Sequence, residues 1–190
     1  MAGPPQDLPV EASPWQTLTS RQVYANAWLT VREDLVLRAD GSPGIYGVMQ
    51  PRRVATGVVA LTDAGEVWLV GQFRYPTDVY SWEIIEGGAD PHEDPLAGAR
   101  RELREEAGLE AADWRLLGGE VHLSNSLTSE RALIYLARGL REVEATPEVT
   151  EVLRLARVPL ARALALVDQG AITDAVSVIG LLRAERLLRG

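Results

Sequence analysis

The feature that most constrains this chain is a helix-forming run bounded by Asp94 and Gly108. Asp94 is of a type that caps helix N-termini, and Pro95 suits the first helical position. The residues that follow, LAGARRELREEA, contain no further Pro and are mostly strong helix formers. Gly108 then ends the run, because Gly readily adopts the left-handed conformation of a helix C-terminus. The sequence therefore predicts a helix over residues 95–107.

Two sets of side chains share one side of this predicted helix. The apolar set recurs at helical spacing and should be buried; it comprises Leu96, Ala99, Leu103 and Ala107. Beside it lie Glu102, Glu105 and Glu106, within about 100° of one another around the helix. Like charges at this spacing repel by roughly a few tenths of a kcal/mol per pair. We therefore expect a neighbouring positive charge, such as a hard divalent cation bound by oxygen atoms. The alternative is a solvated acidic helix.

These residues belong to a longer pattern that starts at Gly87 and ends at Leu109. After Gly87 come five residues and then Glu93. Seven further residues lead to Arg101-Glu102-Leu103, and after one residue each come Glu105-Glu106 and Gly108-Leu109. This pattern resembles the Nudix box, the motif of the Nudix hydrolases. The resemblance implies an α/β fold, an α/β/α sandwich with a mixed β-sheet. It also implies a magnesium-dependent enzyme that cleaves a nucleoside diphosphate linked to another moiety.

Charge and composition argue against several other classes of protein. Lys and Arg number 19 against 27 Asp and Glu, for a net charge of −8, whereas nucleic-acid binders need a basic face. The chain has no Cys, so disulfides and thiolate nucleophiles are ruled out. The N-terminus has no basic start or long apolar run, and no stretch reaches the roughly 18 apolar residues of a membrane span. We expect a cytoplasmic protein that binds neither nucleic acid nor membranes.

Composition divides the chain into three segments. Residues 1–14 hold four Pro and few large apolar residues, which predicts a flexible lead-in. Residues 15–50 contain short β-type runs but are too few for a core of their own. This small N-terminal β appendage should therefore pack on the main domain or on a second subunit. Residues 51–190 are expected to form the Nudix-like domain.

Hydrophobic periodicity predicts the strands and helices. In the appendage, β-type runs cover residues 15–20, 23–25, 28–37 and 45–49. In the main domain, residues 54–61 and 67–73 are expected to be central strands of one sheet, joined by a hairpin turn. Residues 80–85 should form a third strand that leads into the box. Further strands are expected at 114–118, 121–123, 131–137 and 152–158, and helices at 159–169 and 172–188.

The resemblance also implies a set of metal ligands. Magnesium, with manganese as the alternative ion, would be held by the backbone carbonyl of Glu86 and the side chains of Glu102, Glu105 and Glu106. Arg101 lies one turn before Glu105 and is expected to orient it, in a role that is either catalytic or purely structural. Glu93 is either a partner of Arg101 or a further metal ligand.

A general base would help a water molecule to attack phosphorus, and Glu102 and Glu130 are the two candidates. Glu130 lies in a loop of small polar residues, HLSNSLTSER, at positions 122–131. This loop resembles the Ser-Pro-Gly-x-Thr/Ser-Asp/Ser-Glu loop of the ADP-ribose pyrophosphatase branch of the Nudix family. It departs from that loop at Asn125 and Ser126. The alternative is that Glu130 is an ordinary exposed loop carboxylate.

Three residues are candidates for binding the substrate. Arg74, in Gln72-Phe73-Arg74 at a strand end, resembles the same branch and is expected to bind a phosphate. Its alternative partner is Glu83, which is the second candidate. Trp28 is the third, with Tyr24 as its alternative, because in the resembling branch the N-terminal appendage crosses to the partner subunit and helps to hold the adenine. Simple packing is the alternative explanation of Trp28.

Together these residues predict a homodimeric Nudix hydrolase of the ADP-ribose pyrophosphatase branch. Its substrate would be ADP-ribose or a similar nucleoside diphosphate sugar, and its products a nucleoside monophosphate and a sugar phosphate. Ile85 and Glu86 stand where that branch often has Pro and Ala, which leaves the exact substrate open. The alternatives are another diphosphate, such as GDP-mannose, a dinucleotide or FAD, or a non-catalytic nucleotide sensor on the same fold.

Overall fold

The structure, a computed structural model, describes residues 7–145 and 152–190, which fall into two units. The N-terminal unit contains the described residues up to Arg53 together with His122–Arg131. The large unit contains the described residues of Val54–Val121 and Ala132–Gly190. Part of the predicted flexible lead-in, residues 1–6, lies outside the described residues. Residues 7–14 are exposed and contain no helix or strand.

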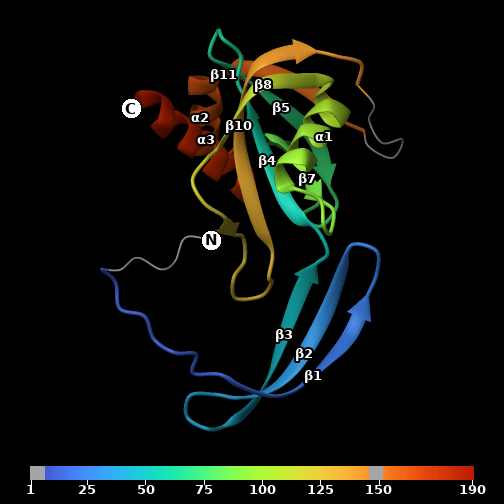
Figure 1. Ribbon diagram of the computed structural model, residues 1–190, viewed down its shortest axis with the longest axis vertical. Coiled ribbons are helices and arrows are strands. Elements are labelled where there is room, and N and C mark those ends of the chain that lie inside the picture. Colours follow the sequence, from blue (N-terminus) through green and yellow to red (C-terminus); the bar gives the residue numbers. More distant parts are fainter. Residues whose placement is uncertain (1–6, 146–151) are drawn as a thin grey trace. The chain divides into compact units, whose positions relative to one another are not determined.

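The N-terminal unit is built on an antiparallel sheet of three strands in the order β1-β2-β3 (Figure 1). Its strands are β1 (Gln16–Ala25), β2 (Leu29–Leu37) and β3 (Pro43–Pro51). The predicted break near Ser20 was wrong: β1 continues through it with only local register shifts. In the turn between β2 and β3, Gly41 adopts the left-handed conformation, with φ of 78°.

The other elements follow in chain order. The strands are β4 (Val54–Ala60), β5 (Glu66–Arg74), β6 (Val79–Glu83), β7 (Ile85–Ala89), β8 (Leu109–Leu116), β9 (Val121–His122), β10 (Arg131–Glu142) and β11 (Arg154–Pro159). The helices are α1 (Pro95–Ala107), α2 (Leu160–Asp168) and α3 (Ala175–Arg189). One sheet has the order β7-β4-β10-β8, and another has the order β11-β5-β6. Because β4 and β10 run parallel while their other neighbours are antiparallel, the first sheet is mixed, as predicted.

Strands β4 and β5 do not share a sheet, contrary to the prediction. The hairpin turn between them is present, with a hydrogen bond from the Gly65 N–H to the Thr62 carbonyl and one isolated bridge between Leu61 and Val67. Beyond that bridge, β4 pairs with β7 and β10, whereas β5 pairs with β6 and β11. A strand has only two edges, and both edges of β4 and both edges of β5 are already paired with other strands.

The predicted strand of residues 80–85 is also divided between the two sheets. Strand β6 ends at Glu83 and pairs with β5, while β7 starts at Ile85 and pairs with β4. At the junction the N–H of Ile84 donates to the hydroxyl of Ser177 on α3, at 2.9 Å. The chain therefore changes sheets where a distant side chain replaces a ladder partner.

Helices cover both faces of the mixed sheet in the large unit, which confirms the predicted α/β/α sandwich (Figure 1). Alternate residues of β4 point to opposite faces. Val58 and Ala60 share a buried cluster with Ala99 and Leu103 of α1. On the other face, a Cβ placed at Gly57 would lie only 2.6 Å from a methyl carbon of Val176 on α3. The part of the chain that the structure describes contains no helix with the length and apolar character needed to cross a membrane.

The close approach at Gly57 predicts a stability effect. Gly57→Ala should lower the free energy of unfolding by about 1–3 kcal/mol, because the added methyl group overpacks the contact between β4 and α3. Gly119→Ala is the matched control, since a Cβ at Gly119 would meet no atom within 4 Å. Urea unfolding of both variants measures the difference. Equal stabilities would contradict this account of the packing.

Candidate active site

Helix α1 begins and ends where the sequence predicted. Pro95 occupies the first turn, and Asp94 stands at the N-cap position in an extended conformation. Asp94 is thus the N-cap residue, although its side chain makes no capping hydrogen bond. At the other end Gly108 is left-handed, with φ of 61°, and its N–H donates to the Arg104 carbonyl at 3.0 Å. These ends hold the box carboxylates on one rigid helix.

Two carboxylates of α1 are buried against strand β7. Glu102 is 9% exposed and Glu106 is 8% exposed. Glu102 Oε1 accepts a hydrogen bond from the Gly88 N–H at 3.2 Å, and Glu106 Oε2 accepts one from the Glu86 N–H at 3.3 Å. Between these two amides lies Gly87, where a Cβ would come within 2.0 Å of the Glu102 carboxyl carbon. The Glu102 side chain therefore fits only because residue 87 has no side chain.

Arg101 contacts both neighbouring carboxylates. One guanidinium nitrogen donates to Glu102 Oε1 and to Glu105 Oε2, each at 2.8 Å. The other donates to the Gly88 carbonyl at 2.9 Å and lies 3.5 Å from Glu93 Oε2. The contacts that the sequence predicted for Arg101 with Glu105 and Glu93 are therefore present. Arg101 therefore links Gly88 on β7 to Glu102 and Glu105 on α1.

These charges perturb one another. Burial raises the pKa of Glu102, although Arg101 and the Gly88 amide act in the opposite direction. Burial acts to lower the pKa of Arg101, but the attraction of Glu102 and hydrogen bonds to Glu105 and Glu93 raise it overall. Arg101 therefore supplies much of the positive charge that the acidic side of α1 requires.

The residues at this site fit a hard divalent cation by their chemistry. They offer only oxygen donors, and the missing side chain at Gly87 leaves the space that the Glu102 carboxylate occupies. Across from Gly87 on β4 lies Thr56, whose buried hydroxyl has no hydrogen-bond partner among the described residues. Within residues 7–145 and 152–190, however, no three acidic, His or Cys side chains are already arranged to hold a metal ion. Arg101 instead neutralises Glu102 and Glu105.

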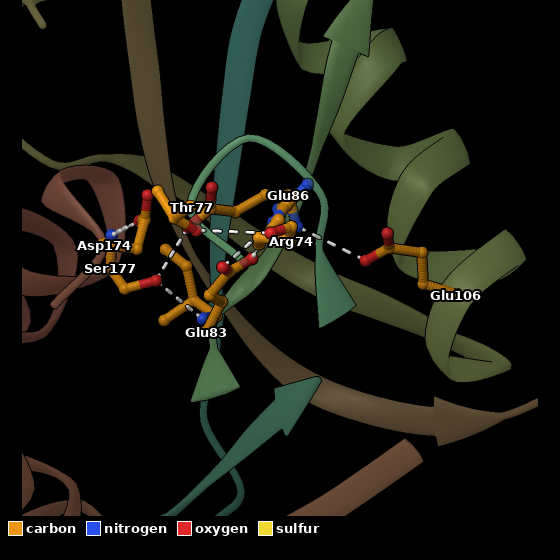
Figure 2. Close-up of polar contacts among 8 residues, drawn as sticks. Arg74, Thr77, Glu83, Glu86, Glu106, Asp174 and Ser177 are labelled. Carbon is orange, nitrogen blue, oxygen red and sulfur yellow. Dashed lines mark hydrogen bonds and ion pairs between the residues drawn. The ribbon is translucent and has the colours of Figure 1, made fainter. Parts of the chain in front are cut away.

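A second cluster surrounds the end of β5 and the β6–β7 junction (Figure 2). Arg74 Nε donates to both carboxylate oxygens of Glu83, at 3.0 and 3.1 Å, and Nη2 donates to one of them as well. Glu83 is only 2% exposed, whereas the Arg74 side chain is 40% exposed. The alternative partner predicted for Arg74 is therefore present, and Nη1 of Arg74 is the guanidinium nitrogen not used in this pair.

The side chain of Glu86 takes part in this cluster, which sequence reasoning missed because it assigned a role only to the Glu86 backbone. Ser177 donates its hydroxyl hydrogen to Glu86 Oε1 at 2.7 Å (Figure 2). Asp174 caps α3 by accepting from the Ser177 N–H at 2.7 Å. Burial, followed by the charge of Asp174, raises the pKa of Glu86 well above its ordinary value. The sequence did contain a signal for this role, because Glu86 stands where the resembling branch often has the small residue Ala.

The remaining candidates, Trp28 and Glu130, belong to the N-terminal unit. Trp28 is 73% exposed, and its backbone N–H donates to the Asn26 side chain at 2.8 Å. The N–H of Glu130 donates to the Thr128 hydroxyl at 3.0 Å, within a loop bonded to Met49 on β3. The other candidate residues all lie in the large unit, so a joint role with Trp28 and Glu130 stays a prediction.

Comparison with known proteins identifies the family of this chain. Residues 51–178 match the NUDIX domain family. The chain belongs to the Nudix hydrolase family. In addition, residues 15–49 match the nucleoside diphosphate sugar hydrolase N-terminal domain. This second match covers strands β1 and β2 and most of β3 of this Nudix hydrolase.

Several relatives cover nearly the whole Nudix hydrolase. It is 31% identical over 180 residues to the ADP-ribose pyrophosphatase of Mycobacterium tuberculosis. The aligned region covers 93% of this chain and 86% of that protein. It is 28% identical to the methanol dehydrogenase activator of Bacillus methanolicus, over 87% of this chain and 90% of that protein. A crystal structure of an ADP compounds hydrolase has the same fold, with a TM-score of 0.84 and 24% identity over 96% of this chain and 98% of that one.

The raised pKa of Glu86 predicts a pH-dependent stability. Above its ordinary pKa of 4.5 the unfolded state loses this proton, whereas the folded state retains it until the raised pKa is reached. The contribution of Glu86 to stability therefore falls as the pH rises through that interval. Glu86→Gln cannot ionise and should be more stable than the parent by about 1 kcal/mol or more near pH 8.

Urea unfolding in EDTA, at about pH 4 and about pH 8, measures this effect. The difference between Glu86→Gln and the parent should be largest at the higher pH and shrink toward the lower one. A difference that does not change with pH would contradict the assignment to Glu86.

Proposed function

We propose that this Nudix hydrolase cleaves the diphosphate of ADP-ribose, or of a similar nucleoside diphosphate sugar, in a magnesium-dependent reaction. The products would be a nucleoside monophosphate and a sugar phosphate. The observation that carries the proposal is the pair of buried carboxylates, Glu102 and Glu106, that α1 holds against β7 around Gly87. The match of residues 15–49 to a nucleoside diphosphate sugar hydrolase domain supports the substrate class.

Oxygen donors of the box would hold the metal. They are the backbone carbonyl of Glu86 and the carboxylates of Glu102, Glu105 and Glu106. When bound, Mg²⁺ or Mn²⁺ neutralises phosphate oxygens and lowers the pKa of a bound water molecule. Arg101 contacts only one oxygen of Glu102 and one oxygen of Glu105, so the second oxygen of each carboxylate would be available to the metal without release of Arg101. Its bond to the Gly88 carbonyl would keep it beside the site.

In the proposed reaction, the oxygen of a water molecule forms a bond to one phosphorus of the diphosphate. The bond from that phosphorus to the bridging oxygen breaks, and the bridging oxygen leaves with the other phosphate. A carboxylate, either Glu102 or Glu130, takes the proton that the water molecule loses. Arg74 would bind a phosphate through Nη1, while Glu83 holds the rest of its guanidinium in place. Trp28 would stack on the adenine.

Other substrates are the closest rivals. GDP-mannose, dinucleotides and FAD contain the same diphosphate group. The RNA pyrophosphohydrolase of Rhizobium meliloti is 40% identical to this chain, but over only 34% of it. The chain's net charge of −8 disfavours an RNA substrate. A nucleotide sensor without activity is disfavoured because every carboxylate of the box is present.

The proposal predicts that hydrolysis requires Glu106. Glu106→Gln should lower kcat by about 100-fold or more, because it removes a proposed metal ligand. Glu110→Gln, which changes a glutamate paired with Arg141 outside the box, is the matched control and should retain activity. Formation of the nucleoside monophosphate from ADP-ribose and from the rival diphosphates, followed by chromatography with magnesium or with EDTA, measures both points.

Unchanged turnover of Glu106→Gln would rule out the metal role. Activity that is greatest on a different diphosphate would replace ADP-ribose and leave the hydrolase assignment intact. Activity that persists in EDTA would overturn the requirement for a metal.

We also propose that the protein is a homodimer assembled through its N-terminal unit, and that it acts in the cytoplasm. The sheet of β1 to β3 exposes more large apolar side chains than an isolated surface favours. They include Leu18, Val23, Tyr24 and Ile45, and Trp28 is exposed in the connection between β1 and β2. Analytical ultracentrifugation at micromolar concentration should give twice the mass of 20.7 kDa. Leu18→Asp with Ile45→Asp should shift the protein toward monomer, and a monomeric parent protein would contradict the proposal.

A further inference from the structure

One buried hydroxyl bonds to both ends of the segment where the chain changes sheets. Ser177 on α3 is completely buried. Its hydroxyl accepts from the Ile84 N–H at 2.9 Å and donates to Glu86 Oε1 at 2.7 Å (Figure 2). Ser177 therefore spans Ile84 to Glu86, the segment at which β6 ends and β7 begins.

The same segment is held from the opposite side by the box helix. The N–H of Glu86 donates to Glu106 Oε2 at 3.3 Å (Figure 2). Glu86 is thus linked through its side chain to α3 and through its backbone to α1. Asp174 in turn accepts from the Ser177 N–H at 2.7 Å, which fixes the first turn of α3 under the segment.

An apolar residue would not replace Ser177 without a cost. Ala at position 177 would leave the Ile84 N–H and the Glu86 carboxyl without these partners, and a buried polar group without a partner is expensive. The segment would then be free to move away from α3. Because the Glu86 carbonyl is a proposed metal ligand, such a movement would weaken metal binding as well as lower the stability of the fold.

We propose that Ser177 is a positioning residue for the metal site. Through Ile84 and the Glu86 side chain it fixes the backbone at Glu86 in the place where its carbonyl can ligate the cation. The glutamate at position 86, where the resembling branch often has Ala, provides the second attachment of this link. The proposal rests on the metal-dependent function described above and adds to it a contribution of α3 to metal affinity.

Direct measurement of Mn²⁺ binding by electron paramagnetic resonance tests the proposal without relying on turnover. Ser177→Ala should weaken Mn²⁺ binding about tenfold, as loss of a group that orients a metal ligand does in other sites. The same variant should need about tenfold more Mg²⁺ for half-maximal hydrolysis, with KM for ADP-ribose changed less than about twofold at saturating metal.

Leu181→Ala is the matched control for a structural effect. Leu181 is completely buried one turn further along α3, so its truncation should destabilise the fold at least as much as Ser177→Ala. It should nevertheless bind Mn²⁺ like the parent protein. If Ser177→Ala does not fold, Glu86→Ala removes the same hydrogen bond from the other side and should show the same weaker Mn²⁺ binding.

The outcomes separate this inference from the proposed function. A parent protein that binds no Mn²⁺ would overturn the metal-dependent function and this inference with it. Normal binding by the parent protein and by folded Ser177→Ala or Glu86→Ala would overturn the role of Ser177 alone. Equal weakening in Leu181→Ala and Ser177→Ala would assign the effect to general destabilisation and would also overturn it.

Discussion

The structure of the candidate site depends on the contact between Glu102 and the backbone of β7. A carboxylate can be buried there because Gly87 has no side chain and the Gly88 N–H donates to it. The same arrangement brings Glu106 to the Glu86 N–H one turn later on α1. Burying charged groups is costly unless they have partners, so the helix and the strand require each other. The spacing of the box is therefore needed for the packing of α1 against β7 as well as for the chemistry of its glutamates.

Local patterns predicted helix α1 well because the relevant signals lie next to one another in the sequence. Pro95 and Gly108 define its two ends, and its apolar residues recur at helical spacing. The partners of the strands could not be found in this way. Val54 and Val67 begin similar apolar runs, yet β4 and β5 join different sheets because other strands already occupy their edges. Which strands those are depends on residues far along the chain.

The contacts within the candidate site were predictable to a similar extent. The glutamates of the box follow from spacing, and so does the contact between Arg101 and Glu105, one helical turn apart. The link from Ser177 to Glu86 joins residues that are 91 positions apart, so no local pattern could reveal it. The same holds for the end of β6, which is set by a hydrogen bond between Ile84 and Ser177 across 93 positions.

The central claim is that the glutamates of α1 hold a divalent cation against β7. A crystal of the protein grown with Mn²⁺ and a non-hydrolysable analogue of ADP-ribose would test it most directly, by anomalous diffraction at the manganese edge. We expect an anomalous peak from a manganese ion that is coordinated by Glu102 and Glu106 and that also binds the diphosphate. Bound analogue without such a peak, or manganese bound away from both carboxylates, would contradict it.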